Sequence, residues 1–418
     1  MPKKSISENQ PRGSLGLIFF ILLMDIIGIT VLSPVAPYIV RRYSSEALAV
    51  TMIPVMYAAA QFLAAPLMGK LGDRFGRRPV LLISLVGQGL GYLLFGLGGS
   101  LGVLLLARVI GGITGGNMST ASAYIADISK PGERAKNFAL IGIAWSLGLI
   151  LGPALGAVLG QMSLEAPAYA AAGLAFLNVL LGIFLLPESL PLEQRETASL
   201  KFRDFNPVIS IAFMAKKPGL GWLLLVTGLF NFAFNGINST GTLFFIQKFD
   251  AQPWQTGLLM MLAGLSLAVV QFLLVQPLVR RFGEKRIAIA SLWGQAVGDV
   301  GIFLAPVFWM VFPINMIMSS LSGFTFPTLT TLNTNCVEPR EVGLLMGVTT
   351  AISSLMNIAG PLWAGTVYDH IMPGTPFWMG ALVLVAAGLM LARKEGVPVS
   401  RPVLSHPENE LPIGAKHE

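Results

Sequence analysis

The pattern of apolar and polar positions divides the chain into twelve long apolar runs separated by shorter polar segments. A helix that crosses a bilayer needs about 20 mostly apolar residues, and the runs are close to or above that length. They cover residues 15–39, 48–69, 79–98, 101–126, 137–160, 168–187, 220–245, 255–278, 287–305, 307–330, 342–366 and 375–392. This pattern predicts an all-α membrane protein with twelve transmembrane helices.

One internal polar stretch is longer than the others and divides the helices into two sets of six. The sequence repeats across it: Phe75-Gly76 recurs as Phe282-Gly283, and Gly152-Pro153 recurs as Gly360-Pro361 at nearly the same spacing. Parallel six-helix repeats are typical of one large transporter class, with the binding cavity between them. We therefore expect two pseudo-symmetric bundles. The expected bounds are a cytoplasmic N-terminal segment 1–14, a first bundle 15–187, a cytoplasmic linker 188–218, a second bundle 219–393 and a cytoplasmic tail 394–418.

The composition and the distribution of charge exclude other classes of protein. The chain is 54% hydrophobic and 12% charged, whereas soluble domains carry about 25% charged residues. Its net charge of +7 is compatible with nucleic-acid binding, but nearly all of the 28 lysines and arginines fall on one side of the predicted helices. The exceptions are Arg41, Arg42, Lys248 and Arg108. The positive-inside rule makes that side cytoplasmic. We expect a multi-pass protein of a cell membrane (a bacterial inner membrane or a plasma membrane), with both termini in the cytoplasm and no nucleic-acid partner.

Residues that support enzyme chemistry are scarce. The chain has one cysteine, Cys336, and its three histidines lie in predicted loops or in the tail. Neither an intrachain disulfide nor a Cys/His metal site is expected from this set. We therefore expect no enzymatic activity, no cofactor and no metal, and the lack of a sizeable soluble domain argues against a receptor.

Three charged residues lie well inside apolar runs: Asp25, Arg108 and Asp299. A lone charge at the centre of a bilayer costs at least about 2.5 kcal/mol, so each should face a cavity or a partner. Burial raises the pKa of a carboxyl group, whereas a nearby arginine lowers it. A change in the balance of these two effects could make Asp25 bind or release a proton. All three residues are candidates for proton coupling. The alternatives are a permanent ion pair of Asp25 with Arg108, and a structural or pore-lining role for Asp299.

Several amide side chains interrupt the apolar runs and are candidates for the wall of a substrate cavity, because polar groups inside a membrane face other helices or water. The candidates are Gln61, Asn117, Asn231, Asn235, Asn238 and Gln295. Three of the asparagines recur at helical spacing in a run that is rich in phenylalanine. A cavity surface with such a polar stripe between aromatic walls would suit flat amphipathic molecules. Contact with lipid or with other helices is the alternative for the aromatic residues.

The polar loop after the second run has the sequence GKLGDRFGRR, from Gly69 to Arg78. It resembles the cytoplasmic signature loop of the major facilitator superfamily. The resemblance implies a gate that latches the two halves in the outward-facing state, with Arg77 paired to an acid such as Asp127. In this loop Asp73 can meet the positive end of a helix. The implied gating residues are Gly69, Asp73, Arg74, Gly76, Arg77, Arg78 and Asp127. A solvated loop that only obeys the positive-inside rule is the alternative.

The fifth run contains Gly148, Gly152, Pro153 and Gly156 in the stretch GLILGPALG. Glycines four residues apart allow close helix packing, and a proline removes a backbone hydrogen bond and kinks the helix. The stretch resembles the motif of the proton-coupled drug antiporters in the same superfamily. Helix packing alone is a sufficient alternative explanation.

The first half most resembles the tetracycline-resistance branch of the drug:proton antiporters, through the surroundings of Asp25 and of Arg108 and the segment 76–82. Gly91 and Gln295 replace two acids that the tetracycline exporters carry. The resemblance implies proton-coupled efflux of amphipathic small molecules by alternating access. It further implies a monomer in membrane lipid, with a cavity lined by the first, fourth, seventh and tenth helices. One alternative is a metabolite or lipid carrier that works by uptake or without coupling. A more remote alternative is a membrane receptor or enzyme that transports nothing.

Overall fold

The computed structural model describes residues 13–115, 117–129, 133–195 and 207–393, and this part of the chain contains helices and no strand. The first half contains α1 (Gly13–Thr30), α2 (Ala36–Val40), α3 (Ala47–Phe75), α4 (Arg77–Leu97), α5 (Leu101–Thr114), α6 (Asn117–Ile128), α7 (Arg134–Met162) and α8 (Ala166–Leu185). The second half contains α9 (Pro207–Ala215), α10 (Leu220–Phe249), α11 (Pro253–Val269), α12 (Val275–Phe282), α13 (Glu284–Leu304), α14 (Phe308–Thr334), α15 (Val342–His370) and α16 (Thr375–Arg393).

The helices agree in number with the apolar runs. Eleven helical stretches in the described chain are long and apolar enough to cross a membrane, and Leu15–Thr30 is a shorter apolar helix. Two of these stretches combine neighbouring elements: α5 with α6, and α11 with α12. The fold is therefore that of an all-α membrane protein.

The first apolar run is not one continuous helix, which corrects the prediction for residues 15–39. α1 ends at Thr30, and α2 begins at Ala36 after a turn. Pro34 and Pro37 account for the interruption, because proline has no N–H to donate and the residue before it avoids the helical conformation. The end of this run is therefore free to contact the other half of the molecule.

Two other predicted segments contain elements that the apolar pattern did not reveal. The eighth run contains a π-helical turn, Val270–Leu274, between α11 and α12. Such a turn holds an extra residue and is often found at functional sites. The segment predicted as a linker, 188–218, contains the nine-residue helix α9, whose short apolar sequence was not recognised as an element.

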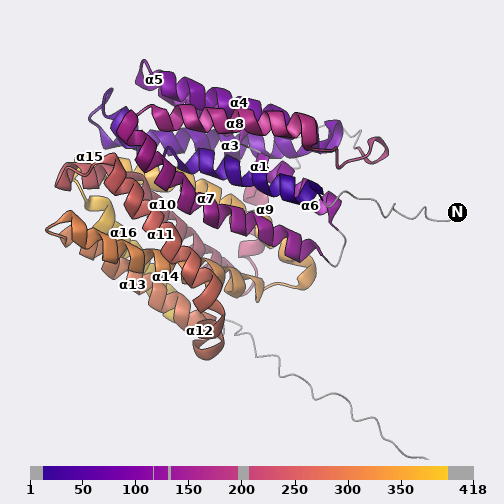
Figure 1. The fold of residues 1–418 in the computed structure, drawn as a ribbon. Helices are drawn as coiled ribbons and strands as arrows, with labels where there is room; N and C mark the ends of the chain where they lie inside the picture. The colour runs from indigo at the N-terminus through magenta and orange to yellow at the C-terminus, as the bar shows by residue number, and fades with distance from the viewer. Residues whose placement is uncertain (1–12, 116, 130–132, 196–206, 394–418) are drawn as a thin grey trace, which may run out of the picture.

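The helices form two groups (Figure 1). In the first group α4 packs on α5 and α8, and α1 packs on α7 and α8. In the second group α10 packs on α15 and α16, and α13 packs on α14 and α16. The groups contact each other most extensively through α7 with α11 and α3 with α15, and α10 also contacts α3 and α2.

The two groups are joined at the end of the molecule where α3 begins and α15 ends, which is called the closed end below. The Asp369 carboxylate accepts hydrogen bonds from the backbone N–H groups of Ala47 and Leu48, at 2.7 and 2.8 Å. It therefore lies at the N-terminus of α3, where a negative charge is favourable. The Tyr38 hydroxyl donates to the Ala251 carbonyl at 2.5 Å, which adds a second polar contact between the halves.

Glycines bring α7 and α11 into backbone contact along the same boundary. A Cβ added at Gly257 would lie 2.8 Å from the Pro153 carbonyl oxygen, and one added at Gly264 would lie 2.9 Å from that of Leu149. Both distances are shorter than a normal van der Waals contact, so larger residues would separate the helices. Small residues have this role in membrane proteins generally.

The two groups separate toward the opposite end, which carries the loop between α3 and α4 and is called the open end below. Figure 1 shows them diverging toward the place where α12 lies. Within the described chain α12 has no buried residue. A Cβ added at Gly69, Gly142 or Gly347 would meet no described atom within 4 Å. The halves are therefore in contact at one end and apart at the other.

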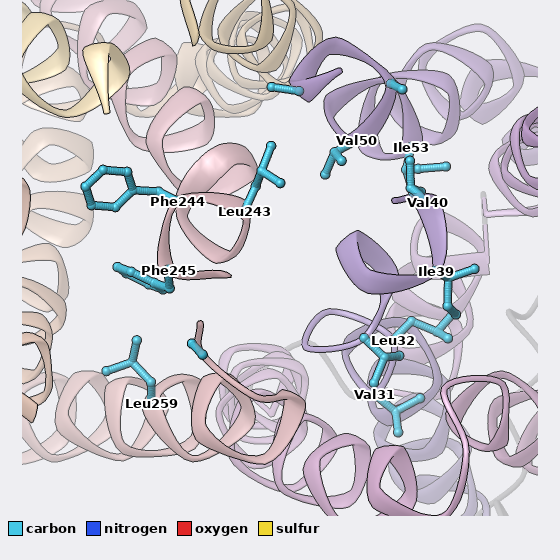
Figure 2. Packing of buried hydrophobic residues seen from close by; sticks show 14 of the residues in the cluster. Val31, Leu32, Ile39, Val40, Val50, Ile53, Leu243, Phe244, Phe245 and Leu259 are labelled. Carbon is cyan, nitrogen blue, oxygen red and sulfur yellow. The ribbon is translucent and has the colours of Figure 1, made fainter. Parts of the chain in front are cut away.

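The largest apolar cluster of the described residues crosses the boundary near the closed end (Figure 2). It contains Val50 and Ile53 of α3 together with Leu243 and Phe245 of α10. Burial of apolar surface stabilises by about 25 cal/mol per Å², so this cluster favours the closed end staying closed.

Candidate functional site

A cavity of about 350 Å³ lies between the two halves. Its wall is formed by α1 and the turn after it, α7, α10, α11, α13, α14 and α16. Of the four helices expected to line it, the first, seventh and tenth do so (α1, α10 and α14). The fourth (α5–α6) does not appear in this wall, which corrects that expectation. A cavity of this size suits a drug-sized molecule.

The wall is mostly apolar, with a band of polar side chains on two neighbouring helices. Its aromatic residues are Phe234, Phe245 and Phe377. The polar side chains from α13 and α14 are Gln295, Asp299, Asn315, Ser319 and Ser322. An apolar wall with a few placed polar groups is typical of small-molecule sites.

Two of the predicted cavity candidates, Asn238 and Gln295, lie in this wall. Gln61 has another role, since its Nε2 donates to the Gly115 carbonyl at 2.8 Å and so joins α3 to the end of α5. Asn117 begins α6, and its side chain lies outside the described part of the structure.

The structure does not place Asn231 and Asn235 in the cavity wall. Asn231 Nδ2 donates to the Thr227 carbonyl, and Asn235 Nδ2 donates to the Asn231 carbonyl, both at 2.8 Å. These side chains bind the backbone of their own helix one turn earlier, as short polar residues commonly do in helices. The predicted polar stripe of α10 therefore contributes only Asn238 to the wall.

Gln295 holds two helices together. Its Nε2 donates to Thr325 Oγ1 at 2.8 Å, and its Oε1 accepts from Ser322 Oγ at 2.7 Å. Both ends of the amide are therefore bonded to α14, and the side chain is almost fully buried. The polar atoms of Gln295 are occupied by the protein itself.

Asp299 lies one helical turn beyond Gln295 in the same wall. It is 1% exposed, and among the described residues neither of its carboxylate oxygens has a hydrogen-bond partner. Among the described residues that line this cavity, Asp299 is the only one with an ionisable acidic or basic side chain. Buried polar groups are nearly always paired, so this carboxyl group requires an explanation.

The other two membrane charges lie together inside the first half. Asp25 is 5% exposed, and both Asp25 and Arg108 are close enough to Tyr57 and Tyr92 to interact with their hydroxyls electrostatically. The Arg108 guanidinium lies 4.3 Å from the Phe95 ring centre and 5.6 Å from that of Tyr92, a geometry in which cations are attracted to aromatic rings. This group, called the Asp25 cluster below, is separate from the cavity wall.

Gly91 lies at a close contact between α4 and α5. A Cβ added there would be 3.0 Å from the Ala107 carbonyl oxygen and 3.2 Å from the Gly111 nitrogen. Backbone atoms on a packed helix cannot move aside easily. A larger side chain at this position would require the two helices to move slightly apart.

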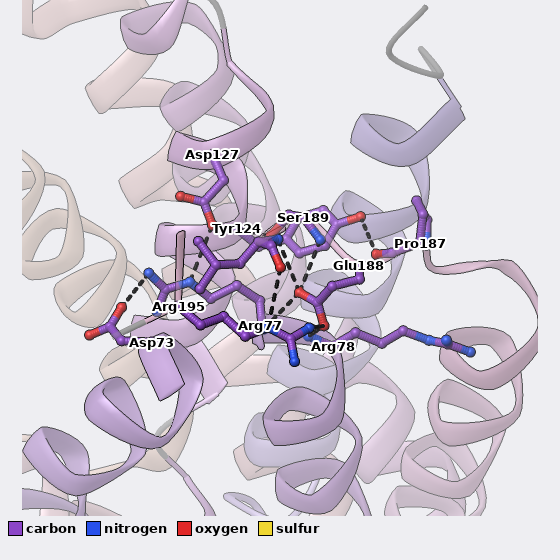
Figure 3. Close-up of polar contacts among 10 residues, drawn as sticks. Asp73, Arg77, Arg78, Tyr124, Asp127, Pro187, Glu188, Ser189 and Arg195 are labelled. Atoms are coloured by element: carbon purple, nitrogen blue, oxygen red, sulfur yellow. Dashed lines mark hydrogen bonds and ion pairs between the residues drawn. The ribbon is translucent and has the colours of Figure 1, made fainter. Parts of the chain in front are cut away.

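The loop between α3 and α4 is organised around Arg77 (Figure 3). It turns at Gly76, whose φ of +103° is a conformation that favours glycine. Arg77 Nη2 lies 2.5 Å from Asp73 Oδ1, and Arg77 Nε lies 3.2 Å from Asp127 Oδ2. Arg77 therefore connects α3 to α6 inside the first half. The equivalent Gly283 in the second half also has a positive φ, +81°.

A third acid, Glu188, caps the start of α4 (Figure 3). Its carboxylate accepts from the backbone N–H groups of Arg77 at 2.8 Å and Arg78 at 3.2 Å, and Arg195 Nη2 lies 3.8 Å away. Glu188 is not among the gating residues predicted from the sequence. Its signal was an acid directly after the sixth run, near a helix N-terminus whose N–H groups need acceptors.

The remaining residues of the loop make other contacts. The Arg74 guanidinium lies 5.5 Å from the Phe75 ring centre, and the Arg78 Nε donates to the Gly182 carbonyl at 3.3 Å. Gly69 is open on the side where a Cβ would project, as far as the described chain reaches. Arg74 and Gly69 are thus available to a surface that approaches the open end.

The glycine face of α7 packs against α1. A Cβ added at Gly148 would lie 2.4 Å from Ile26 Cγ2, and one added at Gly152 would lie 1.9 Å from Thr30 Oγ1. At Gly156 it would lie 2.2 Å from a backbone oxygen of the turn after α1. Pro153 lies inside this helix and leaves a backbone carbonyl without its helical donor. These contacts account for the glycine spacing by packing.

The sequence model of the Major Facilitator Superfamily matches residues 18–280 and 244–416. The chain belongs to this superfamily. The tetracycline resistance protein, class C, of Escherichia coli is 34% identical over 371 residues, which cover 88% of this chain and 92% of that protein. The class G protein of Vibrio anguillarum is 32% identical over 387 residues, which cover 91% and 96%.

Comparison with a solved transporter structure agrees with this family assignment. The crystal structure of the human organic anion transporter MFSD10 (TETRAN) is similar with a TM-score of 0.68 and 27% identity, covering 92% of this chain and 100% of that chain. The chain is therefore a multi-pass transporter of the drug-efflux branch of the superfamily, with a small molecule as substrate. Its homologues and structural neighbours are transporters and not enzymes.

Proposed function

We propose that this transporter exports amphipathic small molecules in exchange for protons. The observation that carries the proposal is the position of α1, which contributes to two sites. Its middle holds Asp25 beside Tyr57 and Tyr92, and its end places Thr30 in the cavity wall. A change of protonation at Asp25 would therefore act on a helix that also contacts the substrate.

The packing of α7 supports this coupling. Thr30 Oγ1 donates to the Gly148 carbonyl at 2.9 Å, which ties α1 to the glycine face of α7. The adjacent face of α7, with Leu149, Pro153 and Ala157, contacts α11 at Gly257 and Gly264. A displacement of α1 would thus be transmitted through α7 to the second half, as a rocking motion of two bundles requires.

The two ends of the molecule would act as alternate gates. We place the open end in the cytoplasm of a bacterial inner membrane or a plasma membrane, with both termini on that side, because Lys70 and Arg74 lie there. In this inward-facing state Arg77 keeps Asp73 and Asp127 within the first half. In the outward-facing state we expect the Asp73 carboxylate to contact the second half and latch the open end.

Two observations favour a substrate other than metal-chelated tetracycline. Gly91 lies at a tight contact between α4 and α5, where a Cβ would be 3.0 Å from the Ala107 carbonyl oxygen. The amide of Gln295 is bonded to Thr325 and Ser322. Neither position offers a free carboxylate to a chelated cation.

The test is substrate accumulation in inverted membrane vesicles under an imposed pH gradient. Asp25→Asn keeps the shape of the side chain but cannot carry a proton, so we expect uphill accumulation to be lost. Arg108→Ala should abolish accumulation as well, because it leaves a buried carboxylate without its compensating charge. Asp250→Asn is the matched control, since it makes the same chemical change at an exposed position of positive φ that asparagine tolerates. Undiminished accumulation by Asp25→Asn would refute the assignment of coupling to Asp25.

The alternative, a metabolite or lipid carrier without coupling, makes a different prediction in the same vesicles. Its exchange would not depend on the pH gradient, and Asp25→Asn would exchange substrate at the rate of the parent protein. We further expect a monomer, embedded in membrane lipid, to be sufficient for transport, which reconstitution at one copy per vesicle would test.

A further inference from the structure

We propose that Asp299 is the recognition site for an organic cation, which makes an amphipathic amine or quaternary cation the substrate class of the cavity. The inference rests on the proposed function as a small-molecule exporter. It begins from an unusual group: a carboxyl that is 1% exposed, lies in the wall of a cavity and lacks a hydrogen-bond partner at both oxygens among the described residues.

The neighbouring polar groups of α13 and α14 make no hydrogen bond to the Asp299 carboxyl group within the described part of the structure. Gln295 uses its amide for Thr325 and Ser291, and Ser322 donates its hydroxyl to Gln295. Ser319 Oγ likewise donates to Asn315 Oδ1, at 3.2 Å. The donors of Gln295, Ser319 and Ser322 are therefore directed to groups other than Asp299.

Within the described part of the chain, the helices around Asp299 place no cationic side chain in contact with its carboxyl oxygens. The sequence of α14 has no ionisable residue, and α16 has only Arg393 at its far end. The charged residues at the start of α13 are distant from Asp299: Arg286, the nearest of them in sequence, lies more than three helical turns away on the same helix. On α10, Lys248 donates to the Phe303 carbonyl and lies 5.1 Å from the Phe249 ring centre.

An ionised carboxylate in a protein interior is strongly unfavourable without a partner. Asp299 must therefore be neutralised either by its own proton or by a cation that enters the cavity. When the cation binds, the proton leaves the carboxyl oxygen for water, and the carboxylate then pairs with the charge of the ligand. The total charge of the cavity is the same before and after this exchange.

The rest of the wall is suited to the apolar part of such a ligand. Phe234, Phe245 and Phe377 contribute aromatic rings, and Met260 and Leu259 contribute aliphatic surface. Aromatic faces attract organic cations by about 0.5–2 kcal/mol. The same wall would give no advantage to an organic anion, which the carboxylate would repel.

The experiment compares two probes of the same shape and opposite charge, tetraphenylphosphonium and tetraphenylborate, binding to the purified full-length transporter in detergent. We expect the parent protein to bind the cation more tightly than the anion. Asp299→Asn should weaken cation binding by about tenfold or more, the usual value of one charge-assisted contact, and should not weaken anion binding. Asp250→Asn is the matched control and should bind both probes like the parent protein.

A second measurement does not depend on any variant. In weakly buffered solution, binding of tetraphenylphosphonium to the parent protein should release about one proton per cation bound, because Asp299 exchanges one for the other. Tighter binding of the anion by the parent protein, equal cation affinity in Asp299→Asn, or cation binding without proton release would each overturn the proposal. These assays use no pH gradient, so their failure is distinct from a failure of proton-driven accumulation in vesicles, which tests the proposed function.

Discussion

The contact between Asp369 and the start of α3 should set the balance between the two states of the transporter. Asp369→Ala removes a carboxylate that accepts hydrogen bonds from the N–H groups of Ala47 and Leu48. Loss of such a cap costs about 0.5–2 kcal/mol, and because this one is partly exposed we expect about 1 kcal/mol. That value corresponds to about a fivefold change in the equilibrium, in favour of opening the closed end.

The assay is a distance measurement between spin labels across the closed end. Labels at the exposed loop positions Ser45 and Met372, with the single cysteine replaced (Cys336→Ser), would report separation of the halves. The long-distance population should rise about fivefold in Asp369→Ala. Glu165→Ala is the matched control, because Glu165 pairs with Arg42 inside the first half. An unchanged distance distribution in Asp369→Ala would show that the apolar cluster alone keeps this end closed.

Three further outcomes are expected. Asp73→Asn should slow transport by about tenfold, the effect of about 1.4 kcal/mol, with little change in melting temperature. Gly152→Val should reduce the free energy of unfolding by about 1–3 kcal/mol, measured by thermal melting, because its Cβ would lie 1.9 Å from Thr30 Oγ1. The hydrogen bond from Lys217 lowers the pKa of the Glu341 carboxyl below its ordinary 4.5. The stabilisation is therefore complete above the unfolded pKa and is lost as the pH falls through the lower folded pKa, so Glu341→Gln should reduce the acid sensitivity of melting.

A specific result would contradict each of these three expectations. Parental transport rates in Asp73→Asn would make that residue an ordinary loop charge. A parental melting temperature in Gly152→Val would mean that α1 and α7 separate at no cost. An identical fall in melting temperature on acidification in Glu341→Gln and in the parent protein would mean that this ion pair does not contribute.

The number and order of the helices could be predicted from the sequence because the bilayer imposes one length on every span. The interruptions could not be predicted in the same way. Pro34 and Pro37 break the first run, yet Pro54 and Pro66 lie inside the continuous helix α3. Whether a proline ends a membrane helix depends on whether neighbouring helices satisfy the freed backbone groups, and that information is tertiary.

The site was predictable only in part, for a related reason. Asp25, Arg108 and Asp299 were identifiable because a charge inside an apolar run needs a partner or a cavity. The asparagines of α10 carry no such constraint, and the rotation of the helix decided that Asn238 reaches the cavity and Asn231 does not. Sequence spacing gives the face of a helix but not the neighbour that the face contacts.

The π-helical turn at Val270–Leu274 divides the eighth span into two helical segments, α11 and α12. A regular helix rotates by about 100° per residue, so one additional residue turns α12 relative to α11 by about that angle. The segment on the closed-end side is fixed by its glycine contacts with α7, whereas α12 has no buried residue in the described chain. We therefore expect closure of the open end to move α12 about the π-helical turn, while the segment packed on α7 keeps its position.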